Sequence, residues 1–177
     1  LIPMSSLHPV LLISSEFPPQ PGGIGNHAYN LAQELTKAGY PLTVLTNSRG
    51  SEQLEEQVFD ARLPFKVHRT PRFRFSIFTY LHRWFGFLNL MFKFPNSIVI
   101  ASGKFSLWMG AAGKRLFKRN RYLGVIHGTE INADGAFSKW LTHKSLPVFD
   151  SLIAVSNFTK ELILKHLPQL KITVLNN

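Results

Sequence analysis

The chain has 177 residues, of which 45% are hydrophobic and 17% are charged, and its formal net charge at pH 7 is +10. A chain of this length and composition forms one globular domain, which buries about 70% of its unfolded surface. The sequence has no cysteine, which excludes disulfides and cysteine-ligated metals and fits a reducing compartment. No basic-then-apolar leader opens the chain, so we expect a cytoplasmic location.

The first predicted element is a buried strand over Val10–Ser14, and a loop rich in proline and glycine follows it. The loop ends in Gly22-Gly23, where a helix is predicted over 26–38, with Gly39 as its stop. Glycines allow a positive φ and the close approach of a ligand to the backbone, and the N-terminus of a helix attracts anions. Doubly wound α/β domains bind their ligands at such a loop. The loop predicts a phosphate-related site, with ordinary turn chemistry as the alternative.

Strands and helices alternate along the rest of the chain. Strands are predicted over 42–46, 65–69, 97–101, 122–126, 151–155 and 172–175, and helices over Ser76–Lys93, 105–118, 137–143 and 158–166. Ser76 is the expected cap of one helix, and Ser156 or Asn157 the cap of another. The polar stretch 51–60 is compatible with either a short helix or a loop, and 128–135 is predicted to be irregular. Apolar strands separated by helices predict a doubly wound parallel sheet with helices on both faces.

Basic residues are concentrated in the middle of the chain, because residues 61–129 include no Asp or Glu. This predicts attraction to phosphates of lipids, nucleotides or nucleic acids, and a solvated basic face is the alternative. The predicted helix Ser76–Lys93 is too interrupted by polar residues to span a membrane. We expect most of it to be buried against the sheet, with the 72–80 end meeting a membrane. The expected contacts with an anionic membrane surface are Arg69, Arg72, Arg74 and Phe75.

Four stretches, in order, carry a family resemblance. The first stretch is Phe17-Pro18-Pro19 with Gly22-Gly23-Ile24 and the helix and strand that follow, and the others are 125–130, 150–162 and 171–177. They resemble the start of retaining glycosyltransferases of family 4. The resemblance implies a GT-B fold of two Rossmann-like domains that face a cleft. It implies that 1–177 is the N-terminal, acceptor-side domain, and that the nucleotide-sugar domain lies outside this chain. Ser97 and Ser102-Gly103 depart from the family pattern, which leaves an acceptor contact from that loop open.

The resemblance also implies the chemistry. Such enzymes move a sugar from a nucleotide-sugar to a lipid-linked or polysaccharide acceptor with retention, without an enzyme nucleophile. Gly22, Gly23 and Ile24 are then expected to bind the donor phosphates or the substrate, and His127 and Glu130 to act at the reacting centre. A structural histidine and a turn-capping glutamate are the alternatives. We expect no cofactor beyond the nucleotide-sugar substrate and no metal, because the other histidines lack metal-ligand spacing.

Two other classes of protein fit less well. A nicotinamide-dependent dehydrogenase requires a third glycine after Gly23 and Gly25, where this chain has Ala28, and an acidic residue after the second strand, where it has Thr46-Asn47. A nucleic-acid-binding module would explain the charge and the interleaved aromatics. It would not explain the glycine loop or His127-Gly128, so we expect no nucleic-acid partner.

Overall fold

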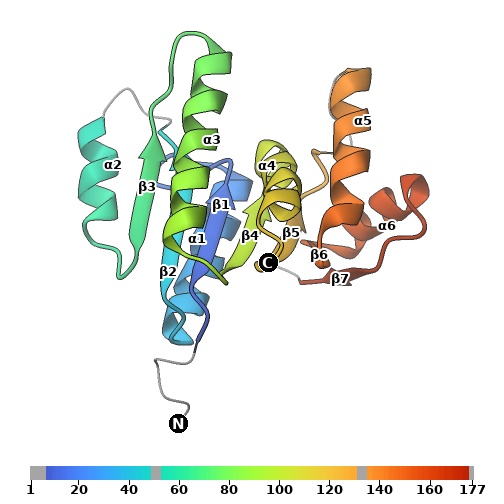
Figure 1. Ribbon diagram of the computed structural model, residues 1–177, viewed down its shortest axis with the longest axis horizontal. Helices are drawn as coiled ribbons and strands as arrows, with labels where there is room; N and C mark the ends of the chain where they lie inside the picture. Colours follow the sequence, from blue (N-terminus) through green and yellow to red (C-terminus); the bar gives the residue numbers. More distant parts are fainter. Residues whose placement is uncertain (1–6, 49–52, 131–134, 176–177) are drawn as a thin grey trace.

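A computed structural model describes residues 7–48, 53–130 and 135–175. Its centre is a seven-stranded, fully parallel sheet with the strand order β3-β2-β1-β4-β5-β6-β7 (Figure 1). The strands are β1 (Val10–Ser14), β2 (Leu42–Asn47), β3 (Lys66–Thr70), β4 (Ile98–Ser102), β5 (Arg121–Ile126), β6 (Ser151–Ala154) and β7 (Ile172–Val174). The predicted doubly wound α/β sheet is therefore confirmed.

Helices cover both faces of the sheet. They are α1 (Gly23–Lys37), α2 (Gln53–Asp60), α3 (Ser76–Lys93), α4 (Lys104–Leu116), α5 (Ala136–Ser145) and α6 (Asn157–His166), with a short 3₁₀ turn η2 (Leu146–Val148). Figure 1 shows α3 and α4 in front of the sheet and α1 behind it. Parallel strands need such crossovers, which explains why their sequences are apolar on both faces.

Each face of the sheet has its own hydrophobic core, because alternate residues of a strand point to opposite faces. In β1, Leu11 and Ile13 pack with α3 and α4, while Val10 and Leu12 pack with α1. All five residues of β1 are buried, as expected of an interior strand that pairs with a neighbour on each side.

The strand order reverses direction at β1, which pairs with β2 on one side and with β4 on the other. The chain leaves β1 toward one face and leaves β4 toward the other. The crossovers therefore diverge beyond the carboxyl ends of these two strands and leave a crevice there, where ligands bind in open α/β sheets.

Several local expectations need correction. Helix α1 begins at Gly23 and not at 26, and α2 shows that 53–60 is helical. The N-cap of α3 is Phe75, so Ser76 is not a cap. Ser156 does cap α6, where its side chain accepts a hydrogen bond from the backbone N–H of Thr159 at 3.1 Å. Residues 131–134 of the predicted irregular region lie outside the described residues.

The expectation that most of α3 is buried is wrong for its N-terminal half. Figure 1 shows this half running past the carboxyl ends of the strands. Its exposed large apolar side chains are Ile77, Phe78, Tyr80, Leu81 and Phe85. The C-terminal half packs on the sheet through Phe87, Leu90 and Met91, which are almost fully buried.

Candidate functional site

A hollow of about 460 Å³ lies at the carboxyl edge of the sheet, beside the end of β1. Its lining residues are Glu16, Gly22, Gly23, Ile24, His127, Thr129 and Val155. The fold thus brings the glycine loop after β1 together with the histidine after β5, which are about a hundred residues apart in the sequence. Gly22, Gly23, Ile24 and His127 were all predicted as site residues, and they share this one hollow.

The N-terminus of α1 borders this hollow. The first intrahelical hydrogen bond runs from the N–H of Asn26 to the carbonyl of Gly22 at 2.9 Å, so the N–H groups of the preceding helical residues have no acceptor within the helix. These free donors and the helix dipole favour an anion in the hollow. The glycines achieve this without a positive φ, since Gly22 is extended with φ 169° and Gly23 is helical.

A close approach between two backbone segments occurs two residues after Gly23, at Gly25. A Cβ at Gly25 would lie 3.3 Å from the backbone nitrogen of Phe17, whereas a Cβ at Gly23 would meet nothing within 4 Å. Gly25 therefore lets α1 pack against the chain that leaves β1. Gly23 is free of packing constraints and borders the hollow.

His127 follows the last residue of β5. Its Nε2 and the Oγ of Ser102 are hydrogen-bonded at 2.9 Å, and Ser102 is the fully buried last residue of β4. Its ring meets the ring of His27 edge-on, with the centroids 5.1 Å apart. These contacts fix the imidazole at the border of the hollow.

Burial, with a smaller contribution from the neighbouring His27, lowers the pKa of His127 to about 4. Burial lowers the pKa of His27 as well. His127 is therefore an uncharged imidazole at neutral pH, a group able to donate or accept a hydrogen bond without adding a positive charge.

Glu130 is fully buried and does not line the hollow. Its carboxylate accepts the backbone N–H of His127 at 3.1 Å and that of Gly128 at 2.8 Å. Burial raises the pKa of Glu130, while these hydrogen bonds act in the opposite direction. In this arrangement Glu130 holds the turn that carries His127, where Gly128 has a φ of 99°. Its placement fits a residue that orients the loop, and direct contact with substrate has no support in this geometry.

The expected membrane residues separate into two groups. Arg69 does not belong at a membrane: its side chain is 10% exposed, and its Nε lies 2.7 Å from Asp60. It also lies 3.4 Å from Glu56, so its charge is used within the fold. Arg72, Arg74 and Phe75 are exposed just before the start of α3, and their contact with a membrane stays a prediction.

Sequence reasoning missed His27 and Ser102 as members of the site. Nδ1 of His27 is buried and has no hydrogen-bond partner among the described residues. His27 falls on the helix repeat of α1, which made it resemble an ordinary helix position. The signal for Ser102 was its place at the carboxyl end of a buried strand.

Neither a metal cluster nor a membrane span occurs in the described ranges. Their residues contain no group of three or more histidine, cysteine or acidic side chains arranged to hold a metal ion. Within the same ranges, no helix has the length and apolarity that crossing a membrane requires.

Comparisons with solved structures support the fold. A glycosyltransferase from Rickettsia africae superimposes with a TM-score of 0.66 at 18% identity, over 97% of this chain and 43% of that one. HepE from Anabaena, solved with UDP and glucose, superimposes with a TM-score of 0.62 at 14% identity, over 96% of this chain and 44% of HepE. A UDP-GlcNAc 2-epimerase from Methanocaldococcus jannaschii superimposes with a TM-score of 0.62 at 14% identity, over 95% of this chain and 45% of the epimerase.

The chain thus spans less than half of these solved proteins, which shows that its fold corresponds to one half of theirs. No curated protein sequence matches it. The family model for Glycosyltransferase Family 4, in contrast, matches residues 21–177. The match includes the glycine loop, the His127 turn and the capped start of α6, and the chain therefore belongs to glycosyltransferase family 4.

Proposed function

We propose that this chain is the acceptor-side domain of a glycosyltransferase that moves a sugar from a nucleotide-sugar to a lipid-linked or polysaccharide acceptor with retention. The observation that carries the proposal is the shared hollow, where the free N–H groups at the start of α1 and the uncharged His127 face the same space. A second, nucleotide-sugar-binding domain completes the site in this proposal.

Each side of the hollow fits one part of the reaction. Loss of the sugar leaves negative charge on the donor diphosphate, and preorganised N–H donors near Gly22 and Gly23 stabilise charge that develops in the transition state. An uncharged imidazole at His127 hydrogen-bonds a sugar hydroxyl, which orients the reacting groups. The UDP and glucose in the complex of HepE, a protein of the same fold, support a nucleotide-sugar as the donor class.

We further propose that the enzyme works on the cytoplasmic face of an anionic membrane. Phe75, Ile77 and Phe78 are each more than half exposed beside Arg72 and Arg74. Neither arginine forms an ion pair with a described residue, so both charges remain available to lipid phosphates. Apolar side chains flanked by arginines are the composition of an interfacial contact.

The experiment is a transfer assay with radiolabelled nucleotide-sugars and a panel of lipid and glycan acceptors. The protein tested joins this chain to a nucleotide-sugar-binding domain, and the 177-residue chain alone is the control. The expected result is product from the two-domain protein, with the anomeric configuration of the donor kept, and no turnover by the chain alone. Transfer by the chain alone, or an inverted product, would contradict the proposal.

A further inference from the structure

Two more hollows adjoin the site, one at the carboxyl ends of β1 and β2 and one alongside the edge strand β3. The first, of about 250 Å³, shares Glu16 with the hollow beside His127 and extends to Ser48 after β2. The second, of about 330 Å³, shares Ser48 and lies between β3 and α2. The shared residues make a chain of adjoining hollows that leads from His127 to α2. We call the last of them the α2 pocket.

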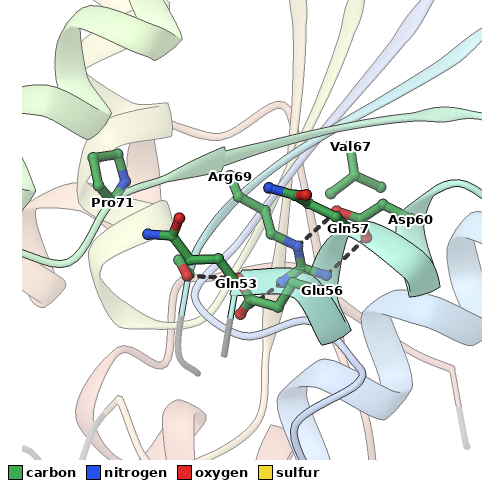
Figure 2. Close-up of a pocket in the computed structure, with 8 residues that line it drawn as sticks. Gln53, Glu56, Gln57, Asp60, Val67, Arg69 and Pro71 are labelled. Carbon is green, nitrogen blue, oxygen red and sulfur yellow. Dashed lines mark hydrogen bonds and ion pairs between the residues drawn. The ribbon is translucent and has the colours of Figure 1, made fainter. Parts of the chain in front are cut away.

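The α2 pocket has a polar wall that is held in place. Figure 2 shows Arg69 between Glu56 and Asp60, with its ion pairs drawn to both. Arg69 donates from Nε and Nη2 to the two oxygens of Asp60 at 2.7 and 2.8 Å. Ser48 donates to Glu56 at 2.5 Å. This network joins α2 to β3 and fixes the two carboxylates in place.

Two amide side chains complete the pocket. Gln53 and Gln57 lie one turn apart on the exposed side of α2 and line the same space. Val67 and Pro71 give the pocket an apolar surface (Figure 2). Fixed carboxylates, side-chain amides and a small apolar surface match the hydroxyls and the C–H face of a sugar ring.

The charges of the described lining residues disfavour an anion. The described lining residues carry two carboxylates and one guanidinium, and the guanidinium is already held by both carboxylates. A phosphate or a uronic acid would face these carboxylates with no free cation among the described lining residues. An uncharged ligand meets no such repulsion.

We propose that the α2 pocket is a distal subsite for an uncharged sugar unit of the acceptor. The assignment as an acceptor subsite rests on the proposed function, while sugar binding by the pocket stands on its own geometry. β5 and β3 are separated by four strand spacings in the sheet order, or about 19 Å. This is farther than one sugar ring spans, so an acceptor that fills both ends of the groove is an oligosaccharide.

The test is a titration of the ¹⁵N-labelled 177-residue chain, followed by the shifts of its backbone amide signals. The probes are maltose, cellobiose and N,N′-diacetylchitobiose as uncharged sugars, and glucose 6-phosphate and glucuronic acid as anionic ones. At least one uncharged disaccharide is expected to shift Ser48, Gln57 and Arg69. The anionic sugars are expected to bind these residues at least tenfold more weakly.

Replacement of both pocket amides, Gln53→Ala with Gln57→Ala, is expected to weaken the disaccharide about tenfold, the effect of losing two neutral hydrogen bonds. Both side chains are exposed, so the fold should be unaffected. Gln169→Ala, at an exposed glutamine outside the pocket, is the matched control and should bind as the wild type does. Absence of shifts with all three disaccharides, tighter binding of an anionic sugar, or equal binding by the pocket variant would overturn the proposal.

The amide shifts report sugar binding without a nucleotide-sugar donor and without turnover. The test of the pocket is therefore independent of the test of the proposed function. Sugar binding at the pocket with no transfer from any nucleotide-sugar would overturn the proposed function and leave the pocket as a sugar site. Transfer with no sugar binding at the pocket would overturn only the subsite.

Discussion

The ring of His27 stands edge-on to the ring of His127, with centroids 5.1 Å apart and the ring planes at 85°. His27 comes from the first turns of α1 and His127 from the end of β5, so the contact joins the two elements that border the hollow. Both imidazoles are uncharged at neutral pH, because burial lowers the pKa of each. The two imidazoles therefore supply hydrogen-bonding groups at the border of the hollow and place no positive charge beside the glycine loop.

The first prediction concerns the pH dependence of stability. The pKa of His127 is about 4 in the folded protein, against 6.5 for an unperturbed histidine. Between these values the unfolded chain binds a proton that the folded chain does not, so the free energy of unfolding falls as the pH falls from 6.5 toward 4. Denaturant unfolding of the wild type and of His127→Gln measures this contribution.

The stability of the wild type minus that of His127→Gln should be constant above about pH 7 and decline toward pH 4, where the folded-state pKa lies. Taking the difference cancels Glu130, whose hydrogen bonds go to the backbone and remain in the variant. A difference that does not change with pH would contradict the lowered pKa of His127.

The second prediction separates function from stability at Gly23. An added Cβ would meet no atom within 4 Å, and alanine is the better helix former. Gly23→Ala should therefore keep the stability or raise it by up to about 1 kcal/mol. The methyl group enters the hollow, so the two-domain enzyme should show a higher KM for the nucleotide-sugar. An unchanged KM in a stable variant would show that the donor does not approach Gly23.

The third prediction is charge-driven binding to membranes. The chain should sediment with vesicles that contain anionic lipid, ignore neutral vesicles, and be released as salt is added. Arg72→Glu with Arg74→Glu should abolish the binding, since each basic residue near an anionic surface contributes about 1 kcal/mol.

Arg115→Glu with Arg119→Glu is the control for the membrane experiment. It makes the same change of charge at two exposed arginines at the C-terminal end of α4 and just beyond it. This control should still bind anionic vesicles. Equal loss of binding in both variants would mean that net charge, and not the end of α3, drives association.

The sheet and most residues that line the hollow could be predicted from the sequence. Apolar runs such as Val10–Ser14 are typical of strands buried on both faces, and β1 has the predicted bounds. Gly22 and Gly23 were found because a glycine loop at the carboxyl end of the first strand is where doubly wound domains bind ligands. His127 was found through the family resemblance of residues 125–130. Neither route needs knowledge of side-chain packing.

The errors came from contacts that depend on packing across elements. The burial of Arg69 depends on Glu56 and Asp60, which lie in a stretch whose helix was left open. The exposed half of α3 was missed because apolar residues occur almost all round this helix, so periodicity does not indicate which side meets solvent. In the same helix Arg83 is buried, and it donates to the carbonyl of Ser14 and to Ser106.

The role of His127 at the reacting centre is tested best by the kcat/KM of His127→Ala in the two-domain enzyme, beside its melting temperature. The side chain borders the hollow at the end of a strand, so the variant should still fold. Its melting temperature should fall modestly, because the buried hydroxyl of Ser102 loses its hydrogen-bond partner. Loss of one positioned polar contact at the reacting centre should lower kcat/KM by ~10- to 1000-fold. A well-folded variant with the wild-type kcat/KM would contradict the proposed function of this side chain and leave His127 as a structural residue.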